Sequence, residues 1–316
     1  MTRSPQAVGA LCAAVAVIFF SINDVVIKFL SGGYALHQVV LIRSLIGLAV
    51  VLALVAPLAK ERQVWRTGKL GWHILRGLCV VAANMTFFLG LAAMELATAV
   101  AIFFVSPLII TAFSVIFLGE RVGPRRWVAV AVGFAGVLVI LRPGTEAFQW
   151  AAMLPVVAAV AYATIHMLTR KIGGTESAAT MAFYIQVVFI LVCSLIGLAV
   201  GDGRFAAQEN PSLAFLLRAW DWPVAGDLWL FAVLGFGVAV AGYLISQAYR
   251  VAEAAFVAPF EYLAMPLAVF WGWLVFGEVI DAPTALGATL IVGAGLFTLW
   301  RETAAGQSAP APRTRR

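Results

Sequence analysis

Long apolar runs separated by short polar joints dominate the chain. Ten such runs occur, each of the length, about 20 residues, that a helix needs to cross the hydrocarbon layer of a membrane. They are centred near Phe19, Gly47, Val81, Ile109, Phe134, Ala159, Phe189, Leu234, Val269 and Ile291. One longer joint, at about 201–227, is expected to be an extramembrane loop lying along the interface. The pattern predicts an all-α integral membrane protein with ten transmembrane helices.

Composition agrees with a surface that meets lipid. Of the 316 residues, 63% are hydrophobic and only 11% are charged, and the mean hydropathy is +0.99. A soluble domain carries about a quarter charged residues. The three cysteines, Cys12, Cys79 and Cys193, lie inside apolar runs with neither metal-ligand spacing nor a secreted disulfide pattern. The sequence predicts no metal site and no cofactor. The first apolar run, 8–30, is expected to be a membrane span and not a cleavable signal peptide.

Lysine and arginine positions predict the orientation, because basic residues gather in cytoplasmic joints. With the N-terminus inside, fifteen of the 21 basic residues fall in cytoplasmic segments, and only Arg142, Arg204 and Arg218 fall outside. Both termini are therefore expected to be cytoplasmic, in a bacterial-type inner membrane, with a disordered tail at 302–316. The net charge of +6 is spread over these joints, so it marks topology and predicts no nucleic-acid partner.

The two halves of the chain repeat a pattern of acids, prolines and glycines. The first half contains Glu95, Pro107, Gly119-Glu120, Pro124, Gly133 and Gly136, and the second contains Glu253, Pro266, Gly277-Glu278, Pro283, Gly293 and Gly295. Glu95 and Glu253 are 158 residues apart, as are Glu120 and Glu278. Five spans are an odd number, so the second copy enters the membrane inverted. We expect one repeat at 8–141 and the other at 149–300, with a binding site between them.

Spans three to five of each half, with the Gly-Glu pairs that close the fourth and ninth helices, resemble the EamA domain of the drug/metabolite transporter superfamily. The resemblance covers about 8–300. It implies a secondary transporter that moves a small organic metabolite by alternating access. Three segments, 21–28, 73–77 and 258–263, resemble S-adenosylmethionine uptake carriers, and riboflavin carriers and amino-acid exporters share much of the frame. The implied substrate is therefore S-adenosylmethionine-like, riboflavin or an amino acid.

Three charges lie within the first two spans, where an unpaired charge costs several kcal/mol. Asp24 and Lys28 are four residues apart and share a helix face, and Arg43 on the second span completes a cluster. One interpretation is a structural ion pair that joins the first two helices. The other is a role in binding the substrate or a coupling proton. The sequence leaves both open.

Glu261 follows Pro259, a residue that kinks or opens a helix and frees backbone groups that must face a cavity or protein. An acid at such a break predicts a cation or proton site, whereas a packing role is the alternative. The resemblance places the central cavity among spans three, four, eight and nine. The candidate substrate-binding residues are Glu261, Tyr262, Asn84, Tyr243, Gln247, Phe104, Trp271, Tyr162 and His166.

Other classes of function find less support in the sequence. No HExxH, CxxC, phosphate loop or nucleophile elbow occurs, and no filter-like loop is present. An intramembrane enzyme or a channel is the alternative to a carrier. The expected partners are a small-molecule substrate and membrane lipid. The resemblance implies that spans five and ten can form a homodimer, and glycine packing within one monomer explains Gly133, Gly136, Gly293 and Gly295 equally well.

Overall fold

In a computed structural model, the structure describes residues 5–59, 63–118, 123–145, 149–172, 176–251 and 258–307. These residues form helices joined by turns, and no strand occurs among them. The first half contains α1 (Pro5–Leu30), α2 (Leu36–Val50), α3 (Ala56–Leu58), α4 (Leu70–Leu91), α5 (Leu96–Phe103), α6 (Ser106–Leu118) and α7 (Pro124–Leu141). The second contains α8 (Met153–Ile172), α9 (Ala178–Val200), α10 (Pro211–Leu217), α11 (Leu228–Val251), the 3-10 segment η4 (Ala258–Leu263), α13 (Ala264–Phe276) and α14 (Ala282–Gln307).

The all-helical class predicted from the sequence is confirmed for the described residues. Seven helical stretches among them are long and apolar enough to cross a membrane, and three shorter apolar helices accompany them. The long stretches are Ala7–Leu30, Leu36–Leu58, Leu70–Leu91, Leu96–Phe117, Trp150–Thr169, Ala178–Val200 and Ala225–Ile245. The shorter ones are Trp127–Leu141, Phe260–Phe276 and Ala282–Phe297. The count of ten spans stays a prediction.

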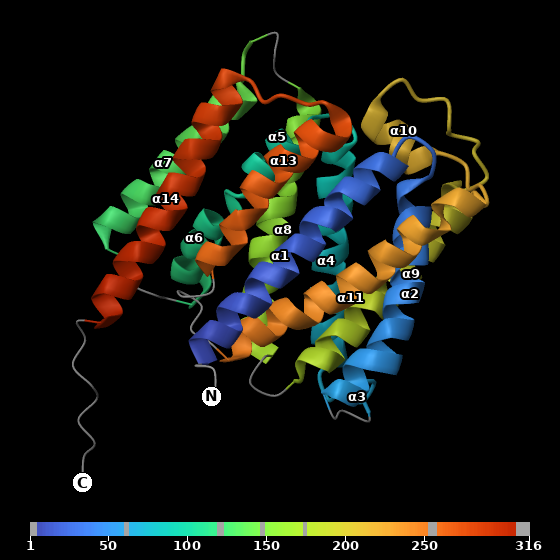
Figure 1. The fold of residues 1–316 in the computed structure, drawn as a ribbon, viewed down its shortest axis with the longest axis horizontal. Helices are drawn as coiled ribbons and strands as arrows, with labels where there is room; N and C mark the ends of the chain where they lie inside the picture. Colours follow the sequence, from blue (N-terminus) through green and yellow to red (C-terminus); the bar gives the residue numbers. More distant parts are fainter. Residues whose placement is uncertain are drawn as a thin grey trace.

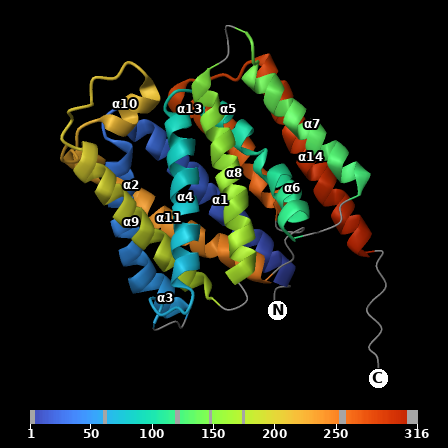
Figure 2. The ribbon, with the colours of Figure 1, turned by 180° about the vertical axis from the view of Figure 1, so that it is seen from behind.

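Helices of the first half pack mainly against helices of the second half. The most extensive packing pairs are α1 with α11, α7 with α14, α4 with α8, and α2 with both α9 and α11. Figures 1 and 2 show these pairs side by side from two directions. In both views α1 begins at the end of the bundle at which α14 ends, and α10 covers the other end. We call the latter the α10 end.

Close backbone contact between α7 and α14 depends on glycine. A Cβ atom built on Gly136 would lie 2.8 Å from the carbonyl oxygen of Gly287, which leaves no room for a side chain. A Cβ on Gly295 would overlap the hydroxyl of Tyr262, whereas one on Gly293 meets nothing within 4 Å. Small residues allow membrane helices to approach in this way. Gly136 is thus used for packing within one chain, and the homodimer stays a prediction.

A helix is interrupted in the first half, and a 3-10 segment leads into a helix in the second half. The first interruption separates α5 from α6 at Phe104 and Val105, shortly before Pro107. Proline has no N–H to donate, and it is tolerated in the first turn of the new helix that begins at Ser106. The second interruption is η4, which leads into α13. The 158-residue spacing of the repeat maps Phe104 onto Tyr262, so both breaks carry an aromatic residue.

The joint at 201–227 folds over the ends of the first helices. The hydroxyl of Tyr34 donates to Asp227 Oδ2 (2.6 Å), and Arg218 Nη1 donates to the carbonyl oxygen of Ser31 (2.8 Å). Ser212 in α10 donates to a carbonyl of α4 at 2.6 Å. These bonds tie the joint to the helix ends, so it covers the α10 end of the bundle.

Candidate functional site

A buried arginine forms the centre of a polar cluster between α1, α2 and α4. Arg43 is 2% exposed. Its Nη1 donates to Asn23 Oδ1 (3.2 Å) and its Nη2 donates to Asn84 Oδ1 (2.9 Å). The guanidinium also lies over the rings of Phe189 (5.3 Å to the centroid) and Phe88 (6.0 Å). Amide oxygens and aromatic faces both stabilise a buried cation. The candidates Arg43 and Asn84 therefore share one site.

Asp24 supplies the negative charge of this cluster. Asn23 donates its side-chain amide to Asp24 Oδ1 at 3.2 Å, and Asp24 is close enough to Arg43 for electrostatic attraction. An amide that bridges an acid and a guanidinium holds both groups in one geometry. Of the three charges that the sequence grouped together, Asp24 and Arg43 lie in this cluster and Lys28 does not, and Asn23 was missed as the connector of the two. Its position beside Asp24 in an apolar run was the available signal.

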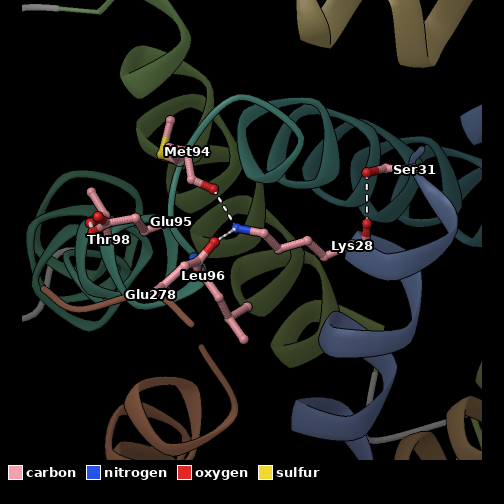
Figure 3. Close-up of polar contacts among 7 residues, drawn as sticks. All are labelled: Lys28, Ser31, Met94, Glu95, Leu96, Thr98 and Glu278. Carbon is pink, nitrogen blue, oxygen red and sulfur yellow. Dashed lines mark hydrogen bonds and ion pairs between the residues drawn. The ribbon is translucent and has the colours of Figure 1, made fainter. Parts of the chain in front are cut away.

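Lys28 has a different partner from the one that helix spacing suggests. It lies in the last turn of α1 and forms an ion pair with Glu278, which follows α13. Its Nζ also donates to the carbonyl oxygen of Met94 at 2.6 Å. Figure 3 shows the lysine reaching away from α1 toward these acceptors. Asp24, one turn earlier, belongs to the Arg43 cluster, so helical spacing alone did not identify either partner.

A second group of candidates surrounds the two helix breaks. The rings of Phe104 and Tyr262 lie 5.2 Å apart, and those of Tyr162 and His166 lie 4.6 Å apart. Glu261 is within electrostatic range of both tyrosines. Tyr262 is only 6% exposed, and its hydroxyl has no hydrogen-bond partner in the described part of the chain. This group, which we call the aromatic site, joins α5, α8 and η4.

The remaining candidates lie at two other places. The indole nitrogen of Trp271 in α13 donates to Ser21 Oγ at 3.3 Å, which connects α13 to the polar face of α1. Tyr243 in α11 packs against a separate apolar cluster that includes Val51 and Val55. Gln247 lies one turn after Tyr243 on the same helix. The structure therefore joins Trp271 to Ser21 of α1 and places Tyr243 with α2 and α9.

The end of the bundle opposite α10 holds polar contacts that sequence reasoning missed as a site. His73 Nε2 lies 3.0 Å from Glu176 Oε2, and the His73 ring stacks on Tyr184 at 4.7 Å. Arg76 Nε donates to Thr169 Oγ1 at 2.7 Å. These contacts join α4 to α8 and to the residues before α9. His73 and Arg76 stand inside an apolar run, which is the signal that marks them.

One ion pair, between Asp281 and Arg142, lies outside the spans and is partly exposed to solvent. Asp281 precedes α14; its Oδ1 accepts the backbone N–H of Thr284 (3.0 Å), and its other oxygen pairs with Arg142. An acid at this position caps the free N–H groups of a helix start. The hydrogen bond to Thr284 and then the Arg142 guanidinium lower the pKa of the Asp281 carboxyl from 3.8 to about 2.

Similarity to known proteins agrees with this arrangement of helices. Residues 7–142 match the model of the EamA-like transporter family. The chain is 34% identical over 301 residues to the riboflavin transporter of Rhizobium johnstonii, covering 95% of this chain and 93% of that protein. The chain belongs to the EamA-like transporter family. It is also 28% identical to the S-adenosylmethionine uptake transporter of Rickettsia prowazekii, covering 89% of each. A solved crystal structure with 19% identity covers 95% of this chain and 99% of its own, with a TM-score of 0.65, and shares the fold.

Membership settles the class of function that the sequence predicted. The protein is a secondary transporter of small metabolites and a multi-pass membrane protein, and it is not an enzyme. The resemblance to the drug/metabolite transporter superfamily is confirmed. Buried charges and unpartnered hydroxyls therefore belong to a protein whose task is to bind and release a solute.

Proposed function

We propose that this transporter carries a flavin of the riboflavin type across the inner membrane by alternating access between two inverted repeats of five spans. The observation that carries the substrate is the aromatic site, in which two aromatic rings in contact and a tyrosine hydroxyl with no hydrogen-bond partner among the described residues lie at the helix breaks. The relative with 34% identity is named a riboflavin transporter, whereas the S-adenosylmethionine relative is 28% identical.

The packing of the helices supports the inverted repeat. A two-fold axis in the membrane plane predicts that the spans next to it pack against their own counterparts in the other half. The same axis predicts that a contact between spans one and eight is accompanied by its symmetry-related contact, between spans six and three. Contacts of α2 with α9, α5 with α13 and α7 with α14 fit the first rule. Contacts of α1 with α11 and of α8 with α4 fit the second.

The chemistry of the aromatic site supports a planar aromatic substrate. The three-ring system of a flavin is neutral and flat, and it stacks on aromatic side chains at about the spacing of Phe104 and Tyr262. Its edge carries two carbonyl oxygens and an N–H, which need a donor such as the Tyr262 hydroxyl and an acceptor such as Glu261. S-Adenosylmethionine carries a sulfonium and an amino-acid group, which call for charged partners in addition to a stacking surface.

Buried charges complete the proposed mechanism. Glu261, at the second helix break, contacts the substrate or a coupling proton. Asp24 and Arg43 form the neighbouring charge cluster, and Asn84 holds the guanidinium in place. A site near the middle of the membrane, at interrupted helices between repeats, is the arrangement expected of a carrier.

Uptake by purified protein in proteoliposomes tests the substrate. Radiolabelled riboflavin should accumulate with saturation and show counterflow, and excess S-adenosylmethionine or amino acids should not compete. Tyr262→Phe removes only the hydroxyl, so KM should rise about threefold to tenfold, the value of one hydrogen bond. Tyr243→Phe makes the same change at a sequence candidate that lies with Val51 and Val55, outside the aromatic site, and an unchanged KM there would confine the substrate site to the helix breaks. Counterflow of S-adenosylmethionine without counterflow of riboflavin would assign the site to the other substrate class.

Reporter fusions test the proposed orientation. With both termini cytoplasmic, a reporter placed after Arg66 or after Arg316 is inside the cell, and one inserted at Gln208 is outside. The α10 end then faces the periplasm. A cytoplasmic signal from Gln208 would contradict the ten-span topology.

A further inference from the structure

Three segments that are far apart in the sequence meet at the α10 end (Figure 3). They are the last turn of α1, the turn between α4 and α5, and the joint after α13. Lys28 Nζ donates to the carbonyl oxygen of Met94 (2.6 Å) and forms an ion pair with Glu278 Oε1. The second oxygen of Glu278 accepts the backbone N–H of Leu96 at 2.9 Å. One acid thus binds both a lysine and the first residue of α5.

Glu278 replaces the cap that α5 lacks. The residue at the usual cap position, Glu95, makes no side-chain bond to the backbone, and its carboxylate accepts the Thr98 hydroxyl at 3.1 Å instead. The first N–H groups of a helix have no partner within the helix, and they favour a negative charge nearby. The carboxylate of Glu278, 182 residues after Leu96, supplies that charge from the other half of the protein.

The backbone after α13 fixes the position of Glu278. Gly277 ends the helix with a φ of +67°, in the left-handed region that glycine adopts without strain. The N–H of Glu278 then donates back to the carbonyl oxygen of Gly272 at 3.0 Å. The N–H of Gly277 itself donates to the carbonyl oxygen of Trp273 at 3.1 Å, which is the bond expected of a helix that ends in a left-handed residue. The Gly-Glu sequence therefore aims a carboxylate at a defined point beyond α13.

The charges and the backbone bonds in this assembly have different roles. The ion pair joins α1 to the end of α13, and its members are 12% and 18% exposed, so each neutralises a largely buried charge. Phe276 covers the ammonium at 5.1 Å. The bonds to Met94 and Leu96, in contrast, hold the neutral backbone of the α4–α5 turn. Breaking them leaves no unpaired charge, whereas breaking the ion pair leaves two.

We infer that Lys28 and Glu278 act as a clamp on the α4–α5 turn: the clamp closes the substrate path at the α10 end, and its two backbone bonds break when the path opens there. The ion pair itself persists through the cycle. This inference rests on the proposed alternating access. α5 leads directly to Phe104, whose ring contacts that of Tyr262, so release of the start of α5 separates α5 from α13 above the aromatic site.

An exchange of the two charges distinguishes a clamp from a structural ion pair. Lys28→Glu with Glu278→Lys keeps an ion pair, but a lysine cannot accept the Leu96 N–H and a carboxylate cannot donate to the Met94 carbonyl. The exchanged protein should fold, and its α10 end should stay open. A second variant, Lys28→Met with Glu278→Gln, removes both charges together and leaves neither unpaired.

A cysteine at the helix break reports the opening without any substrate. Cys12, Cys79 and Cys193 are replaced by alanine, Phe104→Cys is added, and a membrane-impermeant methanethiosulfonate reagent is applied to intact cells and to inverted vesicles. A separate Gln208→Cys variant identifies the side that the α10 end faces. Labelling of the cysteine at 104 from that side should rise about tenfold in both clamp variants, a change typical of a shifted two-state equilibrium.

The ion pair of Arg142 and Asp281 is the matched control. It lies at the same end and joins α7 to the start of α14, and no described contact connects it to the α4–α5 turn. Arg142→Gln with Asp281→Asn should leave labelling at the parent rate. The clamp is overturned if the exchanged variant is labelled at the rate of the parent protein. If the exchanged protein does not fold, the same result in the neutral variant overturns it. If riboflavin is not transported but labelling still rises, the proposed substrate fails and the clamp stands.

Discussion

Replacing Arg43 by methionine should lower the free energy of unfolding by more than the loss of its two side-chain hydrogen bonds accounts for. The methionine keeps most of the side-chain length and removes the charge. Two amide oxygens, those of Asn23 and Asn84, lose a donor. Asp24 loses the cation that attracts it.

The magnitude follows from which of these losses dominates. Hydrogen bonds between membrane helices contribute about 0.6 kcal/mol each on average, so the two amide bonds account for about 1 kcal/mol. A buried charge left without its partner costs about 3–5 kcal/mol. Arg43→Met should therefore lower the free energy of unfolding by about 4 kcal/mol. Adding Asp24→Asn removes the unpaired charge, and the double variant should recover more than half of that loss.

Unfolding in mixed micelles, followed by circular dichroism and tryptophan fluorescence, measures these free energies. Arg204→Met is the control, because Arg204 pairs with Asp202 on the exposed joint, where the two side chains are 56% and 59% exposed. An exposed pair contributes less than about 1 kcal/mol. If the double variant is as unstable as Arg43→Met alone, Asp24 is not the partner charge, and the reasoning on this cluster is wrong.

Three further predictions concern single positions. Glu261→Gln should fold normally and lose net transport, because the amide keeps the shape but carries no charge; unchanged transport with unchanged pH dependence would make Glu261 a packing residue. Gly136→Ala should lower thermal stability in detergent, whereas Gly293→Ala, with open space around it, should not; equal effects would refute the close contact of α7 and α14. Asp281→Asn should cost less than about 1 kcal/mol at neutral pH. Because the folded pKa of Asp281 is lowered, its contribution is complete above pH 3.8 and is lost as the pH falls through about 2, so thermal unfolding of wild type and variant should converge there.

The sequence predicted the fold class and the apolar helices because, in a membrane protein, both follow from the lengths and hydropathy of the apolar runs. Backbone groups in lipid must be satisfied within a helix, so length and hydropathy alone identify helices. The sequence predicted a helix break only beside Pro259, and the break at Phe104 came from the structure. The shorter helices were harder to predict. An interrupted span forms two short apolar helices, whereas the sequence shows a single apolar run. α5 and α6 are an example: together they form Leu96–Phe117.

Partners of the buried charges could not be predicted from local spacing. Helical periodicity indicates which residues share a face, but it does not tell which other helix that face meets. Lys28 therefore looked like a partner of Asp24, four residues away, whereas the structure pairs it with Glu278, 250 residues away. The same limit applies to Tyr243, which lies with the apolar residues of α2 and α9. The sequence showed Glu278 only as part of the Gly-Glu pair that closes the ninth helix, whereas its side chain binds two other segments.

The interrupted helix explains how one end of such a bundle can open while the other stays closed. A continuous span tilts as a rod, so displacement at one end displaces the other in the opposite direction. α5 has only 8 residues, about 12 Å of helix, and it is separated from α6 by the break at Phe104. Its start can leave the Glu278 carboxylate while α6 keeps its packing on α8. In the proposed cycle the break serves as a hinge and the clamp sets the closed position, so the Gly-Glu and proline motifs lie at the part of the protein that we propose to move.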